Sequence, residues 1–376
     1  MAGVTESPLV TPGTVADPRV GQAIESLDTP TLLLDRPACD RNLQRMANHF
    51  ASRPAKLRPH FKNHKCVQLA RRQLELGAVG MTCAKLGEAE VLFDHGITDV
   101  LIANQVVGDA KLARLVNLAG RGDLRVAVDH ADQALAISHA AASAGVVVGL
   151  LVEVDIGMGR CGVAPGEPAV ALARLIRSLP AVRFDGLQAF EGHLVNLTDR
   201  DDRTRQATAA MRSAIDTRRR LEAAGIAVAV VSGCSSATYD STGELAGVDE
   251  VQAGTYATMD RQYHRLVPEF EIALSVLVSV ISRPTARKAV LDIGVKGAGG
   301  EFGVPEIKGH PELQIPFFLS EEHTVVNGVP DWKIGQLLEL VPSHACTTCN
   351  LHREIVVHDS GIVIDVWPIE ASGRLS

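Results

Sequence analysis

Lysine and histidine residues that could bind or react with a ligand are concentrated in one short segment, Arg-Pro-His-Phe-Lys-Asn-His-Lys at residues 58–65. A lysine in a desolvated site has a lowered pKa, and its amine can form a Schiff base with an aldehyde. Lys62 is the candidate for this chemistry, and the alternative is a solvated surface lysine. We expect Lys65 to be a lysine of that second kind.

An arginine stands in a glycine-rich segment, Asp-Ile-Gly-Met-Gly-Arg-Cys-Gly at residues 155–162. A flexible loop that delivers Arg160 suits contact with a ring nitrogen or a carboxylate, and the alternative is a salt-bridged loop arginine. Two other segments, 232–236 and 254–255, contain small and hydroxylated residues. Small residues let backbone N–H groups approach a phosphate, although the same composition is typical of tight turns.

His344 and Cys346 form a pair that could hold a metal ion. They are two residues apart on or beside an expected strand, and alternation along a strand places such side chains on one face. Imidazole and thiolate together favour Zn²⁺, whereas a carboxylate would suit Mn²⁺ or Mg²⁺. The competing interpretation is a histidine and a cysteine that pack in the core.

The elements that position these residues alternate regularly from residue 57 onward. Helix-like stretches separate strand-like runs, and the strands recur every ~27 residues, which fits βα units and a parallel sheet. Eight such units in succession favour a closed (β/α)₈ TIM-type barrel over an open sheet. The eight expected strands are 57–61, 80–84, 99–103, 124–128, 146–154, 184–190, 227–232 and 249–252.

Residues that follow the carboxyl ends of barrel strands form the active site in this architecture. The polar residues singled out above meet that condition, and so do Glu191 and His193 after the sixth strand. The segments 232–236 and 254–255 follow strands seven and eight, the usual position of a phosphate site in such barrels. With that position added, phosphate binding is the favoured interpretation of both segments.

The pattern changes near residue 265, after which strands joined by turns predict a smaller antiparallel β domain. We therefore expect an N-terminal tail at residues 1–28 that becomes ordered near residue 28, a barrel at 29–265 and a β domain at 266–376. The strands expected in the last part are 272–281, 288–293, 336–342, 354–357 and 362–367.

Composition excludes several classes of protein. Of the 376 residues 46% are hydrophobic, and the formal net charge is −7, so a nucleic-acid binder, which is usually basic, is disfavoured. The longest apolar run, 144–152, is far shorter than the ~18 residues that span a membrane. Seven scattered cysteines do not suggest an oxidised framework, which favours a reducing cytoplasm.

Taken together, these motifs resemble the fold-type III, pyridoxal-phosphate (PLP)-dependent D-threonine aldolase / D-serine dehydratase family, whose members are relatives of alanine racemase. The resemblance extends from about residue 28 to residue 374. Its markers are the segments 58–65, 88–89, 155–163, 188–190, 252–256, 292–296 and 342–352.

The resemblance implies a role for each candidate residue. Lys62 would hold the aldehyde of PLP, and Arg160 would face the pyridine nitrogen. The remaining cofactor-binding residues would be His60, Gly233, Ser235, Gly254, Thr255 and Tyr256, the last four near the phosphate. A divalent metal would bind at His344 and Cys346, and relatives suggest a homodimer.

Two positions depart from the aldolase pattern and bear on the reaction. Aldolases of the family carry an aspartate where this chain has Cys346, whereas D-serine dehydratases carry a cysteine there with zinc. Aldolases also often have Tyr-His after the sixth strand, where this chain has Phe190 followed by Glu191, Gly192 and His193. The base is therefore expected to be either Glu191 or His193.

The first expectation is retro-aldol cleavage of a D-3-hydroxy amino acid to glycine, or another small amino acid, and an aldehyde. The alternative is β-elimination, as in a zinc- and PLP-dependent D-serine or 3-hydroxyaspartate dehydratase, in which Lys62 removes the Cα proton. A third possibility, a PLP-binding homeostasis protein without turnover, is disfavoured by the added β domain. A racemase is disfavoured because no tyrosine follows residue 263.

Overall fold

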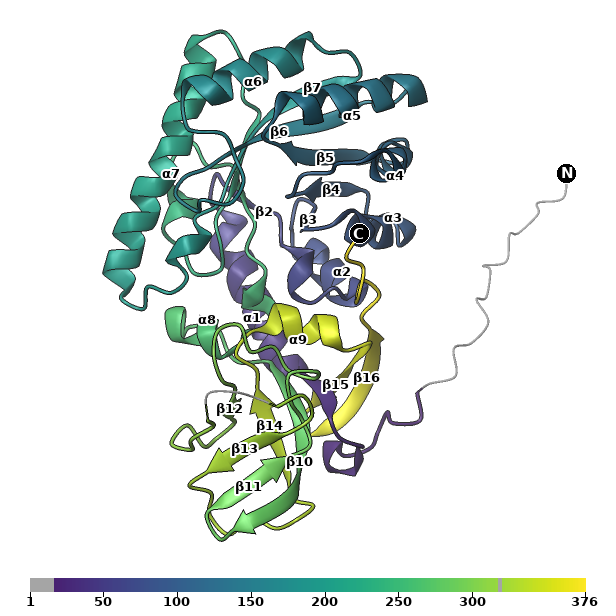
Figure 1. Cartoon of the computed structure of the whole chain (residues 1–376), viewed down its shortest axis with the longest axis vertical. Helices are drawn as coiled ribbons and strands as arrows, with labels where there is room; N and C mark the ends of the chain where they lie inside the picture. The colour runs from purple at the N-terminus through teal and green to yellow at the C-terminus, as the bar shows by residue number, and fades with distance from the viewer. Residues whose placement is uncertain (1–16, 317–319) are drawn as a thin grey trace, which may run out of the picture.

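The structure is a computed structural model that describes residues 17–316 and 320–376. Two parts are visible in Figure 1: an α/β part at the top and a β-rich part below it. The helices of the upper part lie around a sheet of short strands. The chain crosses between the two parts near α1, α8 and α9, so the junction is built from segments that are far apart in sequence.

The upper part confirms the predicted (β/α)₈ barrel. Its eight strands are parallel and follow the order β2-β9-β8-β7-β6-β5-β4-β3. A parallel bridge between His60 and Thr82 joins the two ends of this order, so the sheet closes. The strands are β2 (Lys56–Leu57), β3 (Met81–Cys83), β4 (Asp99–Ile102), β5 (Asp123–Val128), β6 (Val148–Val154), β7 (Val182–Ala189), β8 (Val230–Gly233) and β9 (Glu250–Val251).

Helices connect these strands much as the sequence predicted. Gly145 illustrates how they end: it follows α5 with a φ of 67°, a left-handed conformation that glycine adopts without steric cost. The barrel helices are α2 (Val67–Glu75), α3 (Leu86–Asp94), α4 (Asp109–Ala119), α5 (Ala131–Ala144), α6 (Glu167–Ser178), α7 (Arg200–Ala223) and α8 (Arg261–Leu266). Short 3₁₀ turns are η1 (Ile24–Ser26), η2 (Phe61–Asn63), η3 (Gly192–Leu194), η4 (Thr242–Glu244) and η5 (Thr255–Ala257).

The lower part is built on a sheet with the order β12-β14-β10-β1-β15-β16, and β11 and β13 extend it from β10. Its strands are β1 (Thr31–Asp35), β10 (Leu274–Thr285), β11 (Lys288–Leu291), β12 (Glu306–Ile307), β13 (Thr324–Asn327), β14 (Leu337–Val341), β15 (Glu354–Asp359) and β16 (Ile362–Pro368). Helices α1 (Arg36–Ala51) and α9 (Ala345–Leu351) lie at its junction with the barrel.

The prediction of an antiparallel second domain holds for the described strand pairs except β1 with β15, which is parallel. β1 runs antiparallel to β10 on one side and in the same direction as β15 on the other. The predicted boundary at residue 29 assigned this strand to the barrel, but it pairs with β10 and β15 in the middle of the second sheet.

The N-terminal segment is ordered earlier than predicted. Residues 1–16 of the predicted tail lie outside the described residues, but residues 21–24 pair with the second sheet. The N–H of Ile24 donates to Gly361 O at 2.9 Å, and Val363 donates to Gln22 O at 2.9 Å. Ile24 and Leu27 are buried against the same sheet, and this apolar contact explains why order does not begin at residue 28.

After β16 the chain returns to the first two units of the barrel, close to α3 (Figure 1). Glu370 accepts a hydrogen bond from Val67 N at 2.9 Å, at the start of α2, and Ala371 N donates to Lys65 O at 3.2 Å. The second domain is thereby attached to the segment that contains Lys62. Among the described helices, none combines the length and apolar character needed to cross a membrane.

Candidate active site

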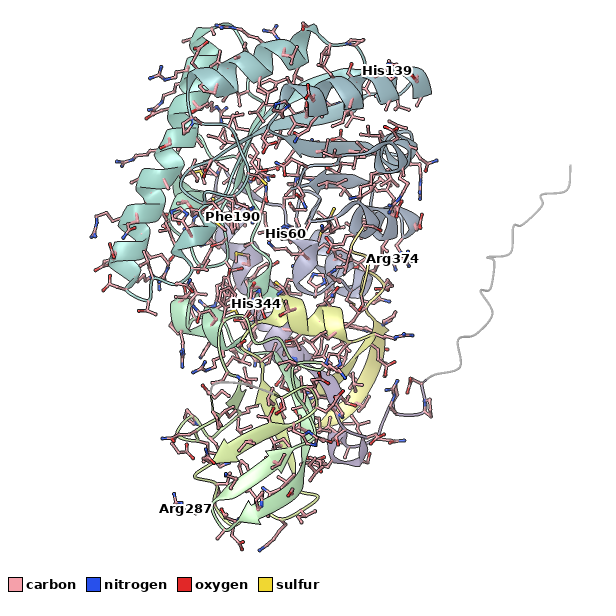
Figure 2. The ribbon with its side chains drawn as sticks, viewed as in Figure 1. His60, His139, Phe190, Arg287, His344 and Arg374 are labelled. Carbon is pink, nitrogen blue, oxygen red and sulfur yellow. The ribbon has the colours of Figure 1, made fainter. Side chains whose placement is uncertain are left out.

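A cavity of about 220 Å³ lies at the carboxyl ends of the barrel strands, where the barrel meets the second domain. Figure 2 shows His60, Phe190 and His344, from three separate elements, around this region. Its walls are formed by His60, Lys62, Asn63, Ala84, Ala103, Asn104, Gln105, Glu153, Arg160, Cys161, Gln188, Phe190, Cys234, Ser235, Ser236, Gln252, Gly254, Thr255, Tyr263 and Cys346. Most of the residues predicted from the sequence therefore converge on one cavity.

Lys62 lies in the turn η2 after β2, which ends at Leu57 and not at the predicted residue 61. Its Nζ lies 5.8 Å from the centre of the Phe190 ring. Among the described residues, no carboxylate forms an ion pair with this amine. His60 caps the turn by accepting from Lys62 N at 3.5 Å, and burial, together with the charges of Lys62 and Arg160, lowers the pKa of His60 well below its ordinary value.

The expectation for Lys65 was wrong. Lys65 is 5% exposed, and its Nζ forms an ion pair with the buried carboxylate of Glu88 at 3.0 Å. The same amine lies 3.4 Å from Ala371 O. The segment after β16 covers this position, a long-range contact that the local sequence does not reveal. The structure thus separates a paired lysine from Lys62, whose amine faces the cavity.

Arg160 is positioned by the glycine-rich loop after β6. Asp155 organises this loop, since its carboxylate accepts from Gly157 N at 2.9 Å and from Gly159 N at 3.1 Å. The Arg160 guanidinium lies 5.7 Å from the centre of the Phe190 ring. Both Arg160 and Lys62 therefore lie over the Phe190 ring, at distances where cation–π attraction contributes.

The predicted phosphate site is formed by two turns on one side of the cavity. Cys234, Ser235 and Ser236 follow β8, and Gly254 and Thr255 follow β9. Among the described residues, the backbone N–H groups of Ser236, Gly254 and Thr255 have no hydrogen-bond partner. Such N–H groups and small side chains fit a phosphate dianion. Together with the unpaired amine of Lys62, these residues fit PLP.

Two predicted cofactor residues do not line the cavity. Gly233 belongs to β8, where a Cβ would lie 1.9 Å from Ala189 O, so strand packing explains this glycine. The Tyr256 side chain is buried on the other side of its turn, and its hydroxyl accepts from Gln73 at 2.9 Å. Its backbone N–H is already paired with Ser236 Oγ at 3.0 Å.

The two candidate bases occupy different environments, and neither is part of the cavity wall. Glu191 is buried, its Oε1 accepts from Thr238 at 2.5 Å and from Thr242 at 2.8 Å, and its Oε2 has no partner among the described residues. Burial raises the pKa of Glu191. His193 is exposed and lies beside Gly157 of the Arg160 loop.

His344 and Cys346 do approach each other, but the geometric reason given from the sequence was wrong. They stand at the N-cap and in the first turn of α9, not on a strand. Burial lowers the pKa of His344, but Cys346 and Asp260 raise it well above its ordinary value. Burial raises the pKa of Cys346, but His344 and then Lys62 lower it overall.

Asp260 fixes the orientation of His344. It is fully buried, and its Oδ2 lies 2.8 Å from His344 Nδ1 and accepts from Ala345 N at 2.9 Å. A histidine whose Nδ1 is held by a carboxylate presents Nε2 to a metal. Within the described residues, however, no group of three or more potential ligands gathers around one point. The pair therefore fits an ion that takes its remaining ligands from water or substrate.

Glu153 and Tyr263 line the cavity but were not identified as site residues from the sequence. Glu153 near the end of β6 accepts from Gln105 at 2.5 Å and lies 3.9 Å from Arg160, and burial raises its pKa. Tyr263 stacks on His344 with ring centres 5.9 Å apart. The signal for Glu153 was present, because a charged residue interrupts an otherwise apolar strand at its carboxyl end.

A closed barrel with a lysine at its mouth that forms no ion pair among the described residues, followed by a β domain, is typical of a cofactor-binding barrel enzyme. Residues 34–262 match the family described as "Alanine racemase, N-terminal domain", and residues 273–358 match "Putative serine dehydratase domain". The chain belongs to this alanine racemase-like, fold-type III family.

Individual relatives agree with this assignment. The chain is 40% identical to a D-threonine aldolase from an Arthrobacter species, over 94% of this chain and 95% of the relative. It is similar to the crystal structure of D-threonine aldolase from Filomicrobium marinum, at 38% identity and a TM-score of 0.92, covering 96% of this chain and 100% of that one.

A D-threo-3-hydroxyaspartate dehydratase from Delftia sp. HT23 is also similar, at 28% identity and a TM-score of 0.84, with 92% of this chain and 98% of that chain covered. These relatives confirm the predicted enzyme class, a lyase.

Proposed function

We propose that the protein is a PLP-dependent lyase that cleaves D-3-hydroxy amino acids, such as D-threonine, by a retro-aldol reaction. The observation that carries the proposal is the Lys62 amine, which faces the cavity without an acidic partner among the described residues, opposite two turns that offer free N–H groups. Similarity to D-threonine aldolases supports the choice of substrate.

When bound, PLP would supply an aldehyde that reacts with amines and a ring that accepts electrons from Cα. Lys62 would hold the aldehyde, and the N–H groups near Ser236, Gly254 and Thr255 would hold the phosphate. Arg160 would donate a hydrogen bond to the ring nitrogen and keep it unprotonated. Phe190 would orient Arg160 and Lys62 through the contacts it makes with both.

His193 is the base that we favour for the 3-hydroxyl proton. It is exposed beside the Arg160 loop, where a bound substrate could reach it. Glu191 is buried and held by Thr238 and Thr242, which suits support of the Ser235 turn better than proton transfer. A divalent ion at His344 and Cys346 would polarise the substrate hydroxyl.

β-Elimination is the second candidate, and Cys346 favours it. By the family resemblance, a cysteine at this position belongs with zinc and dehydratase activity, and the Delftia relative is a dehydratase. In that reaction Lys62 would remove the Cα proton. The predicted homodimer and cytoplasmic location stay predictions.

Product analysis distinguishes the two reactions. The protein, supplied with PLP and with Zn²⁺ or Mn²⁺, is incubated with D-threonine, D-serine or 3-hydroxy-D-aspartate, and L-threonine serves as the stereochemical control. Glycine and acetaldehyde from D-threonine support the aldolase, whereas a 2-oxo acid and ammonia support the dehydratase. If none of the D-substrates reacts and L-threonine does, the proposal is wrong.

A further inference from the structure

Two turns must act together if the proposed cofactor binds, and they come from opposite ends of the barrel sequence. One is the turn that contains Lys62, residues 60–64, and the other is the turn at residues 254–258. They touch directly: a Cβ on Gly254 would lie 2.8 Å from His60 O, and Thr258 donates to Asn63 Oδ1 at 2.9 Å. The relative position of the two turns sets the distance between the lysine and the phosphate site.

A third element, helix α2, also contacts both turns, and it does so through one side chain. Gln73 is 2% exposed. Its Nε2 donates to the Tyr256 hydroxyl at 2.9 Å, and its Oε1 lies 3.2 Å from His64 Nε2. Tyr256 follows Thr255 in the phosphate turn, and His64 ends the turn that contains Lys62.

The donor and the acceptor of each hydrogen bond between His64, Gln73 and Tyr256 follow from the surrounding contacts. His64 Nδ1 accepts from Cys66 N at 3.2 Å, so the ring proton is on Nε2 and is donated to Gln73 Oε1. The Gln73 amide must then present its NH₂ to Tyr256. Burial lowers the pKa of His64 to about 4, so the ring is neutral near pH 7 and this pattern persists.

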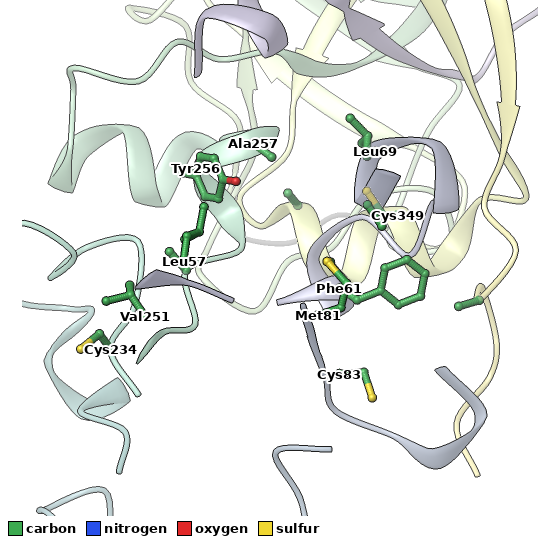
Figure 3. Packing of buried hydrophobic residues seen from close by; sticks show 14 of the residues in the cluster. Leu57, Phe61, Leu69, Met81, Cys83, Cys234, Val251, Tyr256, Ala257 and Cys349 are labelled. Atoms are coloured by element: carbon green, nitrogen blue, oxygen red, sulfur yellow. The ribbon is translucent and has the colours of Figure 1, made fainter. Parts of the chain in front are cut away.

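The hydrogen-bonded chain His64–Gln73–Tyr256 lies among largely apolar side chains, and Gln73 and Tyr256 also border a second cavity of about 390 Å³. The Tyr256 ring is 1% exposed and packs among core side chains that include Leu57 and Ala257 (Figure 3). Its edge meets Phe270 with ring centres 6.0 Å apart. Buried polar groups joined in one chain tend to act as a unit, because breaking one bond leaves its partner unsatisfied in a medium of low dielectric constant.

We propose that Gln73 is a positioning residue that fixes the Lys62 turn relative to the phosphate turn through the chain His64–Gln73–Tyr256. The inference rests on the proposed cofactor but not on the proposed reaction. It explains why the Tyr256 hydroxyl points away from the cavity: it anchors the turn from behind. A ligand that engages both turns at once gains from a preset spacing, whereas a ligand that engages one turn does not.

The test compares ligands that use one turn or both. The apo-protein is titrated with PLP, with pyridoxal, which has the aldehyde but no phosphate, and with inorganic phosphate. Lysine adduct formation is followed by absorbance and phosphate binding by calorimetry. Gln73→Met keeps the length of the side chain and removes both hydrogen bonds. Gln68→Met, at an exposed position of the same helix, is the matched control.

We expect Gln73→Met to raise the Kd of PLP about tenfold, and to change the Kd of pyridoxal and of phosphate less than twofold. Gln68→Met should leave all three values within twofold. An equal loss of affinity for PLP, pyridoxal and phosphate would show that the fold is loosened in general, and it would overturn the proposal. So would an unchanged Kd for PLP.

A second variant keeps the test decisive if Gln73→Met does not fold. Tyr256→Phe removes one hydroxyl and should raise the Kd of PLP more than the Kd of pyridoxal. An equal rise for both ligands would contradict the role proposed for His64–Gln73–Tyr256. In the double variant Gln73→Met with Tyr256→Phe, the loss of PLP binding free energy should be smaller than the sum of the two single losses, because both changes remove the same hydrogen bond. Wild-type protein that binds PLP at Lys62 but shows no lyase activity would refute the proposed reaction and leave this inference standing.

Discussion

Lys62 and Lys65 are separated by two residues, yet the structure gives them different chemistry. Lys65 is held in a buried ion pair with Glu88, so its amine is not available to an aldehyde. Lys62 lies over Phe190 at the cavity wall. The local sequence favours Lys62 and predicts an exposed Lys65, and the second expectation fails because of residues 88 and 371, which are distant in the chain.

Replacement of Lys62 tests this distinction. We expect Lys62→Ala to abolish the visible absorbance of a lysine-bound cofactor and to lower lyase activity at least about 10³-fold, since covalent catalysis is lost. Borohydride reduction of the PLP-loaded wild type, followed by peptide mapping, should label Lys62. Labelling of Lys65, or of Lys85 at the N-cap of α3, would contradict the assignment.

Substitution of Cys346 tests the metal site through the affinity for the ion. Cys346→Ala should lower the affinity for Zn²⁺ at least about tenfold, the order of magnitude seen when ligand shells are altered, and should lower turnover with it. Cys346→Asp should retain a site with greater preference for Mn²⁺. Metal content is measured after dialysis, by mass spectrometry.

Cys349 is the control for these variants, because it is fully buried in the core and absent from the cavity wall. Cys349→Ala should leave metal affinity unchanged and affect only stability. Full activity of Cys346→Ala in metal-free buffer would show that the pair is ordinary packing.

At the scale of elements, the sequence was informative where burial is continuous and uninformative where an element depends on a distant partner. The barrel strands are apolar on both faces, so their positions could be predicted within a few residues. Helix α9 could not: it has seven residues, includes weak helix formers such as Thr347 and Thr348, and starts where Asp260 binds Ala345 N. His344 and Cys346 do lie near each other, but at the start of this helix and not beside one another on a strand, and their role in metal binding stays a prediction.

Prediction of the site residues from the sequence was limited in the same way, by contacts between distant segments. Spacing after each strand located Lys62, Arg160, Ser235 and Thr255 at the cavity, because the barrel brings all strand ends together. It could not show that Tyr256 turns away, since that depends on Gln73 of α2.

The buried ion pair between Lys65 and Glu88 of α3 gives a stability prediction. Glu88→Gln should lower the free energy of unfolding by about 3–5 kcal/mol, because it leaves the buried Lys65 ammonium without a counter-charge. The glutamine oxygen can still accept from Ala84 N, so the cap of α3 is retained. Urea unfolding of the apo-protein measures the change.

Glu90→Gln on the same helix is the control. Glu90 pairs with Arg114 in a partly exposed bridge, so its loss should cost less than about 1 kcal/mol. The double variant Lys65→Met with Glu88→Gln should recover part of the stability. If Glu88→Gln and Glu90→Gln lowered the free energy of unfolding equally, the buried pair would stabilise the fold no more than the exposed one.

At the scale of the whole molecule, buried histidines make the fold sensitive to acid. Burial lowers the pKa of His60, His64 and His358. Their folded forms bind fewer protons than the unfolded chain, so stability is complete above the ordinary pKa of about 6.5 and falls as the pH decreases below it. For His64, with a pKa of about 4, the loss falls between pH 6.5 and pH 4.

His358 offers the clearest test, since both of its ring nitrogens lack partners among the described residues. Burial is the main cause of its lowered pKa, and it is opposed by Asp35 and Glu339. We expect His358→Leu to change stability little at pH 7 and to reduce the loss between pH 7 and pH 5, measured by urea unfolding. The exposed His139→Leu should follow the wild type, and a steeper loss in His358→Leu would contradict this account.

The position of β1 has a consequence for how the chain is made. Since β1 lies between β10 and β15, the barrel is in topological terms an insertion into the β domain. On the ribosome, Leu32, Leu33 and Leu34 emerge first but find their partners only after residues 274–359 have been synthesised. A fragment that starts at residue 266 would have a gap at the centre of its sheet, with two unpaired edges prone to aggregation. Such a fragment should therefore become soluble only when a peptide containing β1 is supplied in trans.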